Sequence, residues 1–145
     1  MKANIKEFIN TIPKDVTIVC ASKYGTSKDI IYLFNNGITN FGENKVDQFL
    51  LKYEALKSYP ITWHFIGHLQ RNKAKKIINK INYLHSLDSL ELAKIIDKER
   101  TTPLNTFIEV SINLEENKNG VDFHNIDKFI ENILPLKNIH LVGLM

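Results

Sequence analysis

A lysine stands at the end of an apolar, β-branched run in the stretch TIVCASKYG, Thr17 to Gly25. Free lysine has a pKa of about 10.4, so only about 0.04% of the amine is unprotonated at neutral pH, and burial without a counter-charge raises that nucleophilic fraction. Such an amine is suited to imine formation with an aldehyde. The alternative is that Lys23 extends into solvent where the strand ends, and the local sequence alone favours this alternative.

Short β-like runs alternate with helix-like stretches along the chain. Strands are predicted at Thr17–Ser22, Ile38–Phe41, Ile61–Phe65, Asn82–Leu87, Thr106–Asn113 and His140–Met145. Helices are predicted at Ser27–Asn35, Glu43–Lys57, Gln70–Lys80, Ser89–Arg100 and Asn125–Leu134, with Ser27 as the N-cap of the first. A strand starts every twenty to thirty-five residues, roughly the length of one βα unit, which predicts a parallel sheet. Without a linker or internal repeat, residues 1–145 are expected to form a single domain.

The alternation of apolar and polar residues in the fifth predicted strand distinguishes a barrel from an open, doubly wound sheet. In TFIEVSIN, Ile108, Val110 and Ile112 form an apolar face, whereas the opposite face, which includes Glu109, is largely polar. An open sheet covered by helices on both sides is apolar on both faces, but the interior of a barrel near its mouth can be polar. A (β/α) barrel is therefore favoured, with Lys23 at the rim where the active sites of barrels are built.

Composition and charge exclude several classes of protein. The hydrophobic fraction of 43% is that of a globular chain, and the net charge of +3 is far below the concentrated basic charge of nucleic-acid-binding proteins. Cys20 is the only cysteine, so no internal disulfide is possible and a reducing compartment fits. The amino terminus lacks the apolar core of a signal peptide, and no other run could span a membrane. We expect a cytoplasmic protein that binds neither nucleic acid nor a membrane.

Several motifs follow one another in the order found in one protein family, namely FGENKVDQF, WHFIGHLQRNKAK, HSLD, SINLEENKNG and a terminal GLM. With these motifs the chain, from about Val16 to Met145, resembles the pyridoxal phosphate homeostasis proteins, also called the proline synthase co-transcribed family. The resemblance implies the (β/α)8-type barrel of the alanine racemase N-terminal class. It also implies that pyridoxal 5′-phosphate is held as an imine of Lys23, because Ala21-Ser22-Lys23 occupies the position of the family's V-S-K motif.

The same resemblance bears on activity. The family is regarded as a cofactor carrier or regulator without established turnover, which implies a non-catalytic, monomeric protein of vitamin B6 and amino-acid homeostasis. The alternative is a lysine-imine barrel enzyme such as an amino-acid racemase. Racemases of the related fold need a second acid–base residue on the opposite side of the cofactor, and none can be placed in this sequence.

Asn44 and His64 are further candidates for contact with the cofactor. Asn44 follows the second strand at the same rim, where its amide could hydrogen-bond the edge of a ligand, although without the resemblance a loop with a helix N-cap is the favoured interpretation. His64 in WHFIG could line the mouth of the barrel, but a lone histidine in an apolar strand is often a satisfied core residue, and both interpretations stay open. Trp63 and Phe65 are expected to pack against the helices. No metal site is predicted.

Basic residues are densest on one predicted helix, at Arg71, Lys73, Lys75, Lys76 and Lys80. A solvated helix face is favoured over a phosphate or RNA site, because a single basic helix is common. Lys118 could attract an anionic ligand, but EENKNG also has the composition of a polar turn.

The number of predicted strands is the last informative feature. The sequence predicts about six βα units, whereas a closed barrel of this class has eight and usually binds phosphate with the loops after strands seven and eight. The serine-rich and arginine-glycine segments with which the family holds the cofactor phosphate lie there. The chain is therefore expected to correspond to roughly the first two thirds of a family member and to bind the cofactor weakly.

Overall fold

The computed structural model describes residues 4–112 and 119–145. Its main sheet has six strands in the order β1-β2-β3-β4-β5-β8, all pairs being parallel. These strands are β1 (Val19–Ala21), β2 (Asn40–Glu43), β3 (Thr62–Phe65), β4 (Tyr83–Leu87), β5 (Leu104–Ile108) and β8 (Ile139–Leu144). Since neighbours in the sheet are also successive along the chain, the sheet has the strand order of a barrel wall rather than of a doubly wound sheet.

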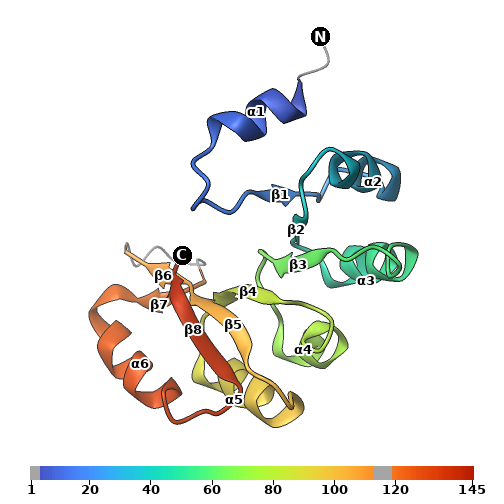
Figure 1. Cartoon of the computed structure of the whole chain (residues 1–145). Coiled ribbons are helices and arrows are strands. Elements are labelled where there is room, and N and C mark those ends of the chain that lie inside the picture. Colours follow the sequence, from blue (N-terminus) through green and yellow to red (C-terminus); the bar gives the residue numbers. More distant parts are fainter. Residues whose placement is uncertain (1–3, 113–118) are drawn as a thin grey trace.

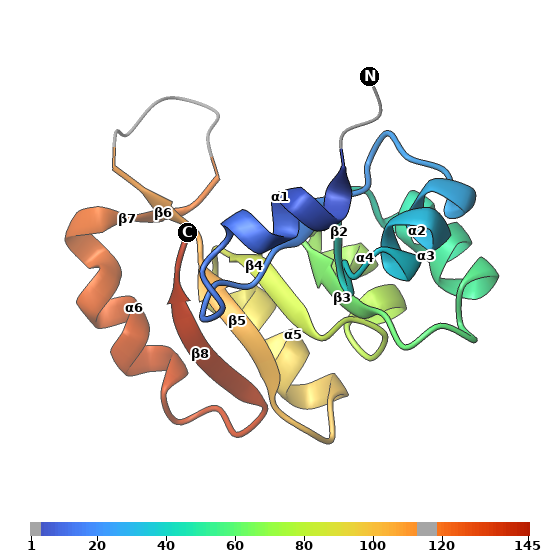
Figure 2. The same ribbon diagram turned by 45° about the horizontal axis from the view of Figure 1, so that its top comes forward.

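Helices connect the strands on the outside of the sheet. They are α2 (Ser27–Asn35), α3 (Val46–Ala55), α4 (Arg71–Ile77), α5 (Leu90–Glu99) and α6 (Ile126–Ile133), with α1 (Ile5–Thr11) before the first strand. Figure 1 shows α2 to α6 as an arc around the curved sheet. Strand β8, which leads to the carboxyl end of the chain in Figure 2, is the edge strand of the sheet farthest from β1. The predicted parallel α/β barrel class is thus confirmed, in a partial form.

The two faces of the sheet differ in chemistry. On the face toward the helices, Trp63 and Phe65 are buried, and the Trp63 ring meets Phe49 of α3 edge to face at 5.5 Å, as expected for residues that pack against the helices. In β5, Leu104, Thr106 and Ile108 are fully buried, whereas the residues between them are only half-buried. The opposite, inner face carries polar and aromatic side chains, including Asn40, His64, Tyr83, His85, Asn105 and Phe107. The predicted polar interior of a barrel is therefore present.

Helices α3, α4, α5 and α6 are shorter than predicted at both ends, and α2 differs from the prediction only in its N-cap. Helix α2 has the predicted bounds, but its N-cap is Thr26 rather than Ser27. The Thr26 hydroxyl accepts a hydrogen bond from the Asp29 N–H, and the Asp29 carboxylate accepts one from the Thr26 N–H. This reciprocal pair is a capping box, which satisfies two otherwise unpaired donors. Glu43 was predicted to start a helix and instead ends β2, fully buried.

The predicted strand Thr106–Asn113 is divided. β5 ends at Ile108, and β6 (Val110–Ser111) pairs with β7 (Val121–Asp122) in a separate two-stranded sheet, with a short 3-10 helix η1 (Phe123–Asn125) following. The prediction that Ile112 shares the buried apolar face was wrong, because the chain leaves the main sheet and Ile112 is 79% exposed. Asn113 lies outside the described residues.

Candidate functional site

Lys23 and Asn44 meet at the carboxyl ends of the first two strands. They line one pocket of about 270 Å³ together with Tyr24, Lys45 and Gln48. Lys23 is exposed, and its Nζ lies 5.1 Å from the centre of the Tyr24 ring. The described lining carries two ammonium groups and no carboxylate, so the pocket suits an anionic ligand with an electrophilic carbon.

A buried ion pair holds the two strand ends behind this pocket. Lys52 of α3 donates hydrogen bonds to Glu43 Oε1 at 2.6 Å and to the Ser22 carbonyl oxygen at 2.7 Å. The Ser22 hydroxyl donates to the same Glu43 oxygen at 2.6 Å. All three side chains are buried, and Ser22 and Glu43 directly precede Lys23 and Asn44 in the chain. The group therefore fixes the backbone from which both pocket residues extend.

His64 lies deeper, on the inner face of β3. It pairs in register with Gly42, two residues before Asn44, and does not line the Lys23 pocket. His64 Nε2 is 2.9 Å from Asn40 Oδ1, and Nδ1 is 2.8 Å from His85 Nε2. Burial, together with the nearby His85, lowers the pKa of His64 to about 4, so its imidazole is neutral at pH 7. The structure thus brings Lys23 and Asn44 together and places His64 below them, with partners at both ring nitrogens.

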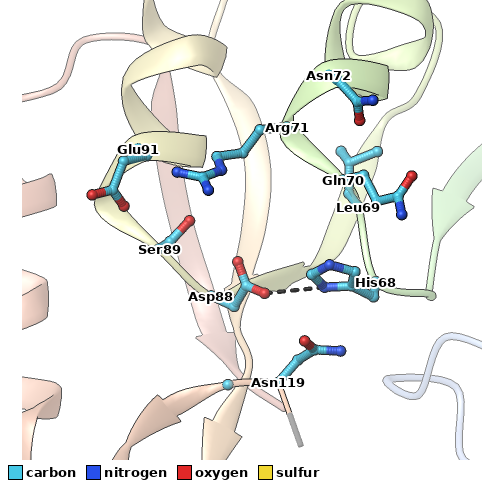
Figure 3. Close-up of a pocket in the computed structure, with 10 residues that line it drawn as sticks. His68, Leu69, Gln70, Arg71, Asn72, Asp88, Ser89, Glu91 and Asn119 are labelled. Carbon is cyan, nitrogen blue, oxygen red and sulfur yellow. Dashed lines mark ion pairs between the residues drawn. The ribbon is translucent and has the colours of Figure 1, made fainter. Parts of the chain in front are cut away.

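A larger cavity of about 700 Å³ opens farther along the same rim (Figure 3). Its walls come from the loops after β3 and β4 and from the residues before β7. His68 Nδ1 and Asp88 Oδ2 lie 3.1 Å apart across it, and Arg71 and Glu91 line its other side. Close to this pair, burial raises the pKa of Glu109 and the charge of Asp88 raises it further. This cavity has a different chemistry from the Lys23 pocket, because it combines carboxylates with a guanidinium group.

The basic helix is largely engaged within the chain. Lys75 pairs with Glu99 at 2.8 Å, and Lys73 lies 3.8 Å from Asp47. Lys80 is placed over the Tyr53 ring at 5.9 Å. These contacts are those of an ion-paired helix surface. Lys118, the other basic candidate, lies outside the described residues.

Several of these residues were not singled out from the sequence, although signals were present. Val46, Phe49 and Leu56 mark the buried stripe of α3, and Lys52 falls on the same stripe, where an unpaired lysine would be costly. His85 stands two residues after Tyr83 in β4 and therefore shares its face. The sequence signals were therefore Lys52, a lysine at a core position of a helix, and His85, a histidine on the same face of a strand as Tyr83.

The described residues contain neither a membrane-spanning helix nor a metal-binding cluster. None of the helices in residues 4–112 and 119–145 is long and apolar enough to cross a membrane. Within the same ranges, no group of three or more His, Cys, Asp or Glu side chains could hold a metal ion.

The fold and its rim lysine define a domain of the alanine racemase N-terminal class. The family model described as "Alanine racemase, N-terminal domain" matches residues 1–145. Among curated proteins, the pyridoxal phosphate homeostasis protein of Aquifex aeolicus (strain VF5) is 41% identical over 134 residues, which are 87% of this chain and 59% of that protein. The one from Buchnera aphidicola subsp. Acyrthosiphon pisum is 36% identical over 136 residues, with 91% of this chain and 68% of that protein covered.

A solved structure gives the same assignment. PipY of Synechococcus elongatus with PLP bound superposes with a TM-score of 0.88 at 26% identity, covering 98% of this chain and 68% of that chain. The chain belongs to the pyridoxal phosphate homeostasis protein family, which confirms the resemblance of its motifs. It spans 59% of the length of the Aquifex relative.

Proposed function

We propose that this chain binds pyridoxal 5′-phosphate without catalysing turnover, through Lys23, and acts in cytoplasmic vitamin B6 and amino-acid homeostasis. The observation that carries the proposal is the shared pocket of Lys23 and Asn44, whose described lining has no carboxylate. The Lys23 amine adds to the aldehyde carbon, a C=N bond forms, and the carbonyl oxygen leaves as water. Asn44 is the polar contact beside it, and His64 is a neutral hydrogen-bonding group below.

Two findings on relatives support the ligand. PipY has been solved with PLP bound, and the curated relatives carry the name pyridoxal phosphate homeostasis protein. The residues of this chain fit such a ligand, because an exposed amine, an amide and a second ammonium group from Lys45 converge on one pocket. An aldehyde that carries a phosphate meets opposite charge there and no carboxylate.

Reductive trapping tests the assignment. The purified chain is incubated with pyridoxal 5′-phosphate, reduced with borohydride, digested and analysed by mass spectrometry. We expect one dominant labelled peptide, carrying Lys23, and its loss in Lys23→Ala. Lys45→Ala is the matched control, because it removes the other ammonium group of the pocket and leaves the reactive amine. A label mainly on Lys45, Lys73 or Lys75 would overturn the role of Lys23.

The non-catalytic part of the proposal has its own test. A racemase interconverts the enantiomers of its substrate, so the chain is incubated with pyridoxal 5′-phosphate and L-alanine and assayed for D-alanine. We expect none above the rate of the free cofactor. The described titratable side chains of the pocket are Lys23, Tyr24 and Lys45, so any proton transfer in the pocket would have to involve one of these three. Production of D-alanine that disappears in Lys23→Ala would favour the racemase alternative.

A further inference from the structure

The cavity of about 700 Å³ beside His68 has the chemistry of a second binding site. It is larger than the Lys23 pocket, and none of its lining residues is shared with that pocket. An intermediate pocket of about 230 Å³ shares Asn44 and Lys45 with the Lys23 pocket, and His68 and Gln70 with the large cavity. The three pockets therefore follow one another along the rim of the sheet.

Opposite charges stand apart in this cavity without neutralising one another. Arg71 has no hydrogen bond or ion pair with any other described residue, although Asp88 and Glu91 line the same space. Figure 3 shows the Arg71 guanidinium directed toward the Ser89 and Glu91 side, with Asp88 and His68 on the other side. A ligand that carries both charges satisfies both sets of groups, whereas a simple anion meets two carboxylates.

The carboxylates in and near the cavity have few hydrogen-bond donors among the described residues. Asp88 Oδ2 is paired with His68, but no described residue pairs with the other oxygen of Asp88, and the Asp88 side chain is only 13% exposed. Nearby, the Glu109 Oε2 atom is buried without a hydrogen-bond partner among the described residues. The Asp88 oxygen without a partner, with the buried Glu109 carboxyl close to it, forms a place for an ammonium group.

We infer that this cavity binds a free α-amino acid in its zwitterionic form. The carboxylate of the ligand pairs with the Arg71 guanidinium, in the bidentate geometry that this side chain favours, and its ammonium group donates to Asp88 on the other side of the cavity. The volume leaves space for a side chain beyond these groups. This inference goes beyond the proposed function, because it requires neither Lys23 nor a bound cofactor.

Amide chemical shifts of the 15N-labelled, cofactor-free chain test the inference with L-alanine as the probe. We expect saturable shifts at Leu69, Gln70, Ser89 and Leu90, on the two loops that carry the charged groups. N-acetyl-L-alanine lacks the ammonium group and L-alanine methyl ester lacks the carboxylate, so each should bind at least about tenfold more weakly. Inorganic phosphate should leave these amides unshifted.

Variants separate this site from the proposed function. Arg71→Gln should weaken L-alanine binding at least about tenfold, whereas Lys76→Gln, which removes an exposed cation of the same helix outside the cavity, should not change it. Lys23→Ala should abolish borohydride labelling and keep L-alanine binding. Arg71 and Lys76 are exposed, so Arg71→Gln and Lys76→Gln leave the core unchanged. Unshifted amides elsewhere in the chain verify that both variants are folded. The inference is overturned if the probe shifts other amides only, if Arg71→Gln binds normally, or if the acetylated or esterified probe binds as well as L-alanine.

Discussion

Gly67 packs directly against the backbone of Asn44. A Cβ atom at position 67 would lie 2.3 Å from the Asn44 carbonyl oxygen and 2.7 Å from the Asn44 Cα. From the other side, the Ser86 hydroxyl donates a hydrogen bond of 2.6 Å to the Gly67 carbonyl oxygen. The loop after β3 therefore lies against the end of β2, and the position of Asn44 depends on the absence of a side chain at Gly67.

Gly67→Ala should displace Asn44 and lower stability. Backbone atoms cannot yield as a flexible side chain does, so we expect a loss of about 1–3 kcal/mol in the free energy of unfolding and slower labelling of Lys23 by pyridoxal 5′-phosphate. Urea unfolding and borohydride trapping measure the two effects. Gly25→Ala is the control, because its added Cβ would meet neighbours at ordinary distances of 3.5 Å and more. Equal behaviour of the two variants would contradict the packing argument.

Lys52→Met should leave a buried carboxylate without its cation. Glu43 is fully buried, and its Oε2 atom has no hydrogen-bond partner among the described residues. Removal of one partner of a buried ion pair typically costs about 3 kcal/mol, which urea unfolding would detect. Lys57→Met, which breaks the exposed pair with Glu54, is the control and should be nearly silent.

A double variant separates stability from positioning. Lys52→Met combined with Glu43→Gln removes both charges, so we expect it to regain much of the lost stability. The hydrogen bond from Lys52 to the Ser22 carbonyl oxygen is not regained, and labelling of Lys23 should stay slower than in the parent chain. If labelling recovers together with stability, the ion pair serves folding alone.

Asn44→Ala should weaken pyridoxal 5′-phosphate binding without lowering stability. The Asn44 side chain lines two pockets, and no described residue accepts or donates a hydrogen bond to it. One lost ligand hydrogen bond corresponds to roughly three- to tenfold weaker binding, measured by absorption titration. Gln48→Ala, which shortens another amide of the same pocket, serves as the comparison; a larger effect there would assign the polar contact to Gln48.

Acid should destabilise the chain through His64. The folded pKa of about 4 lies below the ordinary value of 6.5, so between these values the unfolded chain binds a proton that the folded chain does not. The part of the free energy of unfolding that depends on neutral His64 is fully present above about pH 6.5 and is lost as the pH falls toward 4. Burial also lowers the pKa of His85, in the same direction.

The size of this effect is measurable. Each pKa unit corresponds to about 1.4 kcal/mol, and solvent at the open inner face reduces it, so we expect a loss of about 2 kcal/mol from His64 between pH 7.5 and pH 4. Urea unfolding of the parent chain and of His64→Gln at both pH values measures the joint contribution of His64 and its contact with His85, since groups remote from this pair titrate equally in both. His124→Gln, on an exposed histidine, is the control. Parallel pH profiles for the parent chain and His64→Gln would contradict the assignment.

The fold was predictable where local pattern and tertiary environment agree. The alternation of β5 and the spacing of the strands predicted a barrel wall, and Lys23 and Asn44 were placed at its rim because parallel strands end at the same edge. The division at Glu109 was not predictable, because the residues on either side continue the same alternation and only the pairing of β6 with β7 turns the chain away. Tertiary pairing there overrides local propensity.

The buried polar contacts were the part that the sequence did not predict. Glu43 and Lys52 lie nine residues apart, on a strand and a helix, and their contact depends on how α3 packs against β2. Arg71 and Asp88 come together only through the packing of consecutive βα units. Neither relation follows from the periodicity of a single element.

The hydrogen bonds that link Asn40, His64 and His85 all run in the same donor-to-acceptor direction. Asn40 donates its side-chain N–H to Thr39 Oγ1 at 3.2 Å, so its oxygen is the atom that faces His64 and accepts the Nε2–H. A neutral imidazole carries one N–H, which leaves His64 Nδ1 to accept the proton of His85 Nε2. The same rule leaves a lone pair on His85 Nδ1. The three side chains thus form a row of aligned dipoles that ends in a proton acceptor, and this part of the inner face presents a base, not an acid, to whatever lies against it.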